Sequence, residues 1–152
     1  MTNPEFRFDE TPISPLMFIE ASAGTGKTYT LQRLVLRFIV EKSIPIESFL
    51  IVTYTEAATA ELSGRVREIL GRTVLGLSPG SESKLTEPER KEFKKLRDKW
   101  THDGITLEEA LDRVRRSLEE FDRCAIYTIH SFCRKMLESW AFSGGNPFEG
   151  EI

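Results

Sequence analysis

The sequence predicts an α/β fold, specifically a partial parallel sheet with flanking helices and a helical insertion. Two short apolar runs, 17–19 and 49–52, are each followed by a pattern with helical periodicity. A third apolar run, 124–127, precedes another such pattern after a long stretch that has helical patterns only. Alternation of strands and helices is typical of parallel sheets, because each strand needs a crossover to return to the same end of the sheet.

The first strand and helix are expected within residues 17–42. Residues 1–16 contain three prolines and are interpreted as an irregular lead-in to the apolar run 17–19, the expected first strand. From Lys27 to about Lys42, apolar residues recur at every third or fourth position, which indicates an amphipathic helix. The glycine-rich segment between the strand and the helix is expected to form a tight turn.

The second strand and helix follow a proline-containing loop at 43–48. Residues 49–52 are continuously apolar, as is typical of a strand buried on both faces of a parallel sheet. A second helix is expected from about residue 56 to residue 70. Residues 1–76 are therefore predicted to form a strand–helix–strand–helix unit.

Residues 77–122 are interpreted as a helical insertion between the second and third strands. Thr86 and Thr106 each stand three residues before a glutamate, which is the capping-box arrangement that starts a helix. The helix after Thr86 is highly charged, and the helix after Thr106 has one apolar face. Residues 123–152 then supply the third strand and a helix that continues through Trp140.

The glycine-rich turn matches a phosphate-binding loop, with alanine at the first glycine position. Glycines allow positive φ and bring backbone N–H groups close to phosphate oxygens, and the following helix directs its positive end at the same anion. Lys27 would reach the β- and γ-phosphates of ATP, and the Thr28 hydroxyl would be a ligand of Mg²⁺. The alternative is an ordinary strand–helix turn that contains a lysine. The candidate ATP-binding residues are Ala21, Ser22, Ala23, Gly24, Thr25, Gly26, Lys27 and Thr28, of which Lys27 and Thr28 are the candidate catalytic residues.

Hydrolysis of a nucleoside triphosphate also requires a carboxylate for Mg²⁺ and the attacking water, normally in an acidic pair after an aliphatic strand. The pairs Glu108–Glu109 and Glu119–Glu120 lie within helical patterns, and neither pair follows a strand. We therefore expect these 152 residues to bind nucleotide without hydrolysing it.

Three segments resemble the superfamily 1, UvrD-like helicases. Residues 19–31 resemble their Walker A motif, 52–62 their motif Ia, and 127–133 their motif Ib. Within this superfamily the blocks are similar to those of the RecB family, the beta subunits of exodeoxyribonuclease V, and the related AddA family has similar blocks. The resemblance covers about residues 17–148 and implies that 1–152 is the N-terminal part of the helicase ATP-binding domain, without motifs II to VI or the nuclease domain.

The resemblance implies an ATP-dependent DNA helicase and exonuclease subunit that acts in double-strand-break repair and recombination in the bacterial cytoplasm. It implies ATP and Mg²⁺ as cofactors. Its implied partners are DNA, as single strands and duplex ends, and the other subunits of an exodeoxyribonuclease V-type complex. The residues implied to bind DNA follow the second and third strands: Thr53, Tyr54, Thr55, Thr128, His130 and Ser131.

Each of these six residues also has a purely structural interpretation. Tyr54 could pack in the core, the threonines could cap the helices that follow them, and His130 could serve as a structural residue at a strand–helix junction. The family resemblance favours DNA contact, and these alternatives stay open at this point.

Composition limits the possible functions further. The chain has 21 basic and 24 acidic residues and a net charge of −3, which excludes a polybasic nucleic-acid binder and requires any DNA contact to be local. No apolar run approaches the roughly 18 residues that a membrane helix needs, and the first eleven residues lack the apolar segment of a signal peptide. Another nucleotide-binding enzyme, such as a nucleotide kinase, is an alternative, but it would need a set of lid arginines and an acidic substrate site, and the sequence shows neither. A non-hydrolysing DNA- or protein-binding module remains an alternative.

Overall fold

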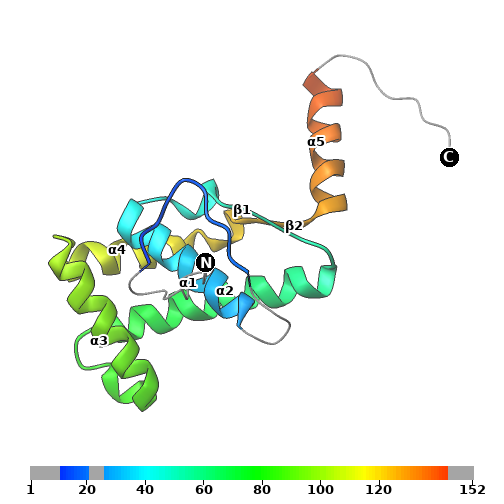
Figure 1. The fold of residues 1–152 in the computed structure, drawn as a ribbon. Coiled ribbons are helices and arrows are strands. Elements are labelled where there is room, and N and C mark those ends of the chain that lie inside the picture. Colours follow the sequence, from blue (N-terminus) through cyan, green and yellow to red (C-terminus); the bar gives the residue numbers. More distant parts are fainter. Residues whose placement is uncertain (1–10, 21–25, 144–152) are drawn as a thin grey trace, which may run out of the picture.

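The computed structural model describes residues 11–20 and 26–143, and the order of elements expected from Lys27 onward is confirmed (Figure 1). Short 3-10 turns at Ile46–Ser48, Glu82–Lys84 and Phe121–Arg123 connect the main elements. The helices and strands of the described part are α1 (Lys27–Lys42), β1 (Leu50–Thr53), α2 (Glu56–Leu77), α3 (Glu87–His102), α4 (Leu107–Glu119), β2 (Ala125–Thr128) and α5 (Ile129–Ser143).

The two strands β1 and β2 form a parallel sheet, as the alternation of strands and helices predicts. Leu50 pairs with Ala125 and Thr53 pairs with Thr128, so the two strands start and end together. Ile51 and Ile126 are partly buried and pack against the helical core, with α2 in contact with both strands. The carboxyl ends of β1 and β2 therefore lie side by side at one edge of the sheet.

The expected first strand is not present in the structure, so the prediction of a third parallel strand is wrong for the described residues. Residues 17–19 have no strand pairing, and the side chain of Phe18 is 97% exposed. An isolated extended segment is not stable as a strand without a hydrogen-bonded neighbour. Within the described residues this segment pairs with neither β1 nor β2.

The prediction that the second strand is buried on both faces is also wrong. Leu50 is 51% exposed and Val52 is 42% exposed, whereas Ile51 between them is partly buried. The helices cover one face of the sheet, and no described element covers the other. A continuously apolar strand is typical of sheets with helices on both faces, so the sequence is suited to a second cover that the described residues do not supply.

The main core lies among the first four helices. α1 and α2 pack against each other and against α4, and α3 packs against α2 and α4. The largest fully buried apolar side chains include Trp100, Leu36, Leu70 and Leu96. α2 continues to Leu77 instead of ending near residue 70, because its last turns also bury apolar residues in this core.

The helices of the predicted insertion thus share a core with the first half of the chain. Both capping boxes are confirmed, because Thr86 bonds with Glu89 and Thr106 bonds with Glu109. These bonds lower the pKa of both glutamates. The division of the chain at residues 76 and 122 stays a prediction.

α5 differs from the other helices in its position. Figure 1 shows that it projects from the end of the sheet, away from the helices of the core. Its side chains Leu137 and Trp140 are 67% and 73% exposed. None of the helices in residues 26–143 has the length and the apolar composition that crossing a bilayer requires.

Glu41, near the end of α1, holds α1 and α3 together through charged groups. Arg37, whose side chain is almost fully buried, donates two hydrogen bonds to the Glu41 carboxylate, at 2.7 and 2.8 Å. Lys99 lies 3.2 Å from the same carboxylate, and the Trp100 indole N–H donates to it at 3.3 Å. Burial raises the pKa of Glu41, but the hydrogen bonds and charges of Arg37 and Lys99 outweigh burial and hold the pKa below its ordinary value.

We expect Glu41→Gln to destabilise the chain at neutral pH by about 3 kcal/mol, because it leaves the Arg37 charge buried without its partner. A carboxylate with a lowered pKa stabilises the fold above its unfolded-state pKa, near 4.5, and this contribution is lost as the pH falls through the folded-state value. The stability difference between the wild type and Glu41→Gln, measured by urea unfolding, should therefore shrink below about pH 4.5. Glu47→Gln, at an exposed position, is the matched control. An equal loss in both variants, or a difference independent of pH, would contradict this prediction.

Candidate nucleotide-binding and DNA-binding sites

The phosphate-binding loop is only partly described by the structure. Ala21, Ser22, Ala23, Gly24 and Thr25 lie outside the described residues, so their predicted contacts with ATP are not addressed. The loop ends at Gly26, which precedes α1 and has a φ of +89°, in the left-handed region where glycine is favoured. The backbone therefore turns into α1 in the conformation that the motif requires of this glycine.

The first turn of α1 suits an anion. It contains no acidic residue, and no described side chain caps its free N–H groups, so the positive end of the helix is available. Lys27 is exposed and can extend toward a phosphate, and Thr28 is half-buried beside it. These described groups fit a nucleotide phosphate with Mg²⁺, in which Thr28 would be the protein ligand of the metal ion.

An ion pair fastens α3 to the start of α1, and the sequence patterns did not indicate it. The Arg33 guanidinium donates two hydrogen bonds to the Glu92 carboxylate, at 2.5 and 2.7 Å. Its carbon Cζ lies 3.2 Å from the centre of the Tyr29 ring, and the Tyr29 hydroxyl donates to Glu92 at 3.4 Å. The Arg33 and Glu92 side chains are only 7% and 15% exposed. The helix that carries Lys27 and Thr28 is thus held against the predicted insertion.

At the end of β1, the two threonines have structural bonds. The Thr55 hydroxyl accepts a hydrogen bond from the backbone N–H of Ala58 at 3.1 Å and so caps α2. The Thr53 hydroxyl bonds with the Thr59 hydroxyl and donates to the Thr55 carbonyl at 3.2 Å. The capping interpretation therefore holds for Thr55, and Thr53 supports the same turn.

The end of β2 is built in the same way. The buried Thr128 hydroxyl accepts from the backbone N–H of Ser131 at 3.1 Å and donates to the Ser131 hydroxyl at 2.9 Å. Ser131 donates in turn to the Glu56 carboxylate at 3.2 Å, which connects the start of α5 to the start of α2. These bonds fix the two strand ends relative to each other.

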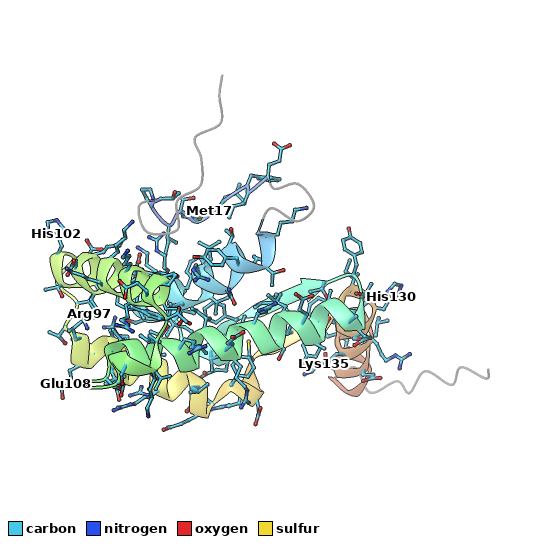
Figure 2. All side chains as sticks on the ribbon, turned by 90° about the horizontal axis from the view of Figure 1, so that it is seen from below. Met17, Arg97, His102, Glu108, His130 and Lys135 are labelled. Atoms are coloured by element: carbon cyan, nitrogen blue, oxygen red, sulfur yellow. The ribbon has the colours of Figure 1, made fainter. Side chains whose placement is uncertain are left out.

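Tyr54 and His130 differ from their neighbours because both are exposed. Tyr54 is 86% exposed, which contradicts the alternative that it packs in the core. His130, on the first turn of α5, projects outward in Figure 2. Lys135 lies one turn further along α5, with its ammonium 4.8 Å from the centre of the Tyr127 ring. The sheet edge thus combines an available aromatic ring with basic groups.

The acidic pairs considered for hydrolysis lie elsewhere. Glu108 and Glu109 form the first turn of α4, and Glu119 and Glu120 end it. In the part of the chain that the structure describes, no cluster of histidine, cysteine and acidic residues could hold a metal ion. Neither pair directly follows the carboxyl end of a described strand.

The UvrD/REP helicase N-terminal domain matches the sequence over residues 3–148. The chain belongs to this family. The assignment agrees with the resemblance of the three sequence blocks and with the parallel pairing of β1 and β2. In this UvrD/REP domain, the blocks that resemble motifs Ia and Ib lead from the two strand ends that the structure places side by side.

Similar curated proteins come from several bacteria. RecBCD enzyme subunit RecB of Haemophilus influenzae is 35% identical over 158 residues, a match that covers 93% of this chain and 12% of the relative. The Escherichia coli subunit is 33% identical over 150 residues, with 93% and 12% coverage. The Chlamydia trachomatis subunit is 37% identical over 127 residues, with 83% and 12% coverage. The chain thus spans 12% of the length of these relatives.

We expect Thr128→Val in this UvrD/REP domain to cost about 1 kcal/mol, because it removes the hydroxyl that caps α5. Urea unfolding measures the loss, and amide hydrogen exchange should be faster at Ser131, whose N–H loses its acceptor. Thr101→Val, on the exposed surface of α3, is the control and should leave both measurements unchanged. Unchanged exchange at Ser131 in Thr128→Val would show that the cap is dispensable.

Proposed function

We propose that the chain is the N-terminal, ATP-binding portion of a RecB-type, ATP-dependent DNA helicase and exonuclease subunit that acts in double-strand-break repair and recombination. The family match over residues 3–148 carries this proposal. The exposed Lys27 and the half-buried Thr28, directly after a left-handed Gly26, support it. The RecB relatives named above favour the RecB type over the AddA type.

In this proposal α1 binds the triphosphate of ATP. Lys27 would place a positive charge beside the β- and γ-phosphates, Thr28 would hold Mg²⁺, and the loop motif of residues 21–26 would supply backbone amides to the phosphate oxygens. In the whole protein, hydrolysis of ATP bound here would supply the free energy for unwinding. The pair Arg33–Glu92 keeps the first two turns of α1 in a fixed position against α3.

Single-stranded DNA is proposed to pass over the edge formed by the ends of β1 and β2. Tyr54 offers its ring to a base, and His130 offers a hydrogen-bond donor to a phosphate. Thr53, Thr55, Thr128 and Ser131 hold the turns that carry these two side chains, and their hydroxyls lie along the same edge. Most of the candidate DNA-binding residues therefore act mainly by positioning.

The remaining parts of the proposal follow from the relatives. We propose that the whole protein assembles with the other subunits of an exodeoxyribonuclease V-type complex, engages duplex ends, and works in the bacterial cytoplasm. A non-hydrolysing binding module is the second candidate for these 152 residues taken separately, because neither acidic pair lies at a strand end.

Lys27→Ala should abolish binding of a fluorescent ATP analogue to this chain in the presence of Mg²⁺, because the mobile positive charge at the loop is lost. Lys42→Ala, at the other end of the same helix, is a control with the same loss of charge. We also expect no ATP turnover by the wild-type chain, measured as phosphate release. Equal binding by the two variants would contradict the phosphate-binding assignment, and turnover that depends on Lys27 would reveal an overlooked carboxylate.

Tyr54→Ala should weaken binding of single-stranded DNA by roughly 5- to 150-fold, because one base loses a stacking partner worth about 1–3 kcal/mol. Fluorescence anisotropy with a labelled oligonucleotide measures the affinity. Tyr54→Phe keeps the ring and should retain most of it. Phe18→Ala removes another fully exposed ring and is the control. Equal losses in Tyr54→Ala and Phe18→Ala, or none in either, would remove Tyr54 from the DNA site.

A further inference from the structure

The outer side of α3 carries an excess of positive charge. The carboxylates of Glu89 and Glu92 turn inward, where Glu89 lies 3.2 Å from Arg72 on α2 and Glu92 is bonded to Arg33 on α1. Lys99, also on the inner side, pairs with Glu41. The outer side carries five cations, Arg90, Lys91, Lys94, Lys95 and Arg97, beside the exposed carboxylates of Glu87 and Asp98.

Three of these cations surround a hollow between the end of α2 and α3. The hollow has a volume of about 300 Å³, and its lining contains no acidic residue. Figure 2 shows Arg97 on α3, at the opposite end of the molecule from His130 on α5. We call this feature the α3 hollow, and its lining residues are Gly76, Leu85, Arg90, Phe93, Lys94 and Arg97.

The floor of the α3 hollow is apolar and tightly packed. A Cβ atom at Gly76 would lie 2.7 Å from Cγ of Phe93, so only glycine allows α2 to approach α3 this closely. Phe93 and Leu85 are buried. The backbone positions that carry the cations are therefore held by two packed helices.

The spacing of the cations matches a repeating anion. Arg90, Lys94 and Arg97 lie at positions i, i+4 and i+7, so they share one face of α3 and span about 10 Å along its axis. Base pairs rise by about 3.4 Å along each strand of a duplex, so this span corresponds to about three steps of a phosphate backbone. The Arg90–Glu87 pair at 3.7 Å is exposed on both sides, and such pairs contribute little to stability, so a phosphate can replace Glu87.

We propose that the α3 hollow is a second DNA-binding site, which holds the phosphate backbone of duplex DNA without reading its sequence. The choice of DNA as the polyanion rests on the proposed function, whereas the hollow and its charges do not. This site is separate from the edge where β1 and β2 end, and it involves none of the candidate ATP-binding residues. The chain has a net charge of −3, so contact with DNA requires a local cluster of positive charge, and the α3 hollow supplies one.

The test compares two triple variants of the 152-residue chain that lose the same charge. Arg90→Gln/Lys94→Gln/Arg97→Gln removes the cations of the α3 hollow. Arg115→Gln/Arg116→Gln/Arg123→Gln removes three cations near and after the end of α4 and is the control. Anisotropy with a labelled duplex is measured between about 50 and 200 mM salt. We expect the first variant to lower the slope of log K against log salt by about 2–3, since each lost phosphate contact contributes about 0.9, and the control to change it much less.

Circular dichroism checks that the variants fold, and the single exposed substitution Lys94→Glu should weaken duplex binding in the same direction. Equal losses in the two triple variants would overturn the proposal, because only net charge would then matter. Absence of duplex binding by the wild type would overturn it as well. Competition by polyglutamate as effective as competition by unlabelled duplex would also overturn it, because it would indicate an acidic protein partner. ATP-analogue binding by the first variant separates this result from the nucleotide assignment, because we expect it to be unchanged there and lost only in Lys27→Ala.

Discussion

The parallel pairing of β1 with β2 is the constraint on which the candidate sites depend. Thr53 stands opposite Thr128, although 75 positions separate them in the sequence, so two turns from distant parts of the chain meet at one edge. The hydrogen bond from Ser131 to Glu56 closes the gap between the helices that follow. A shift of either strand by one residue would turn its core isoleucine, Ile51 or Ile126, toward water. That Tyr54 and His130 both follow strand ends at this edge is thus a consequence of how the core packs.

The charged groups inside the helical core have a related role. Arg33 and Arg37 lie on the buried side of α1, and each meets a carboxylate, of Glu92 or Glu41 respectively, in a bidentate arrangement. Burial of an arginine is tolerated only when its charge is paired and its donors are satisfied. Both pairs connect α1 with α3 or with residues that contact α3, so the proposed nucleotide-binding helix is held by ionic bonds as well as by apolar packing.

Much of this fold follows from local patterns in the sequence. The bounds of α1, the two capping boxes and the parallel order of β1 and β2 are predictable because caps and periodicity act over a few residues. The fate of residues 17–19 is not, because an apolar run becomes a strand only if a neighbour pairs with it. The same reason explains why Leu50 and Val52 are exposed. The apolar run 49–52 indicates a strand that suits packing on both faces, but it does not show which segment packs against the second face.

The candidate sites show the same limit. Gly26 and Lys27 are predictable, because the loop motif is continuous in sequence. Thr55 and Thr128 are ambiguous in the sequence, since a hydroxyl after a strand serves equally as a cap or as a phosphate contact, and the structure gives both a capping bond. The inward position of Glu89 and Glu92 depends on arginines from two other helices, so the excess of positive charge on the outer side of α3 emerges only when these elements are packed together.

The length of α2 sets the distance between the sheet edge where β1 and β2 end and the α3 hollow. Its first residue, Glu56, lies at the sheet edge, and Gly76, near its last residue, lies under α3. With 22 residues, α2 is about 33 Å long, or roughly ten steps of a duplex. A continuous helix does not shorten or bend easily, so α2 keeps the two regions at a fixed separation. A nucleic acid that touches both ends must cover about one full helical turn, and oligonucleotides much shorter than that can occupy only one end at a time.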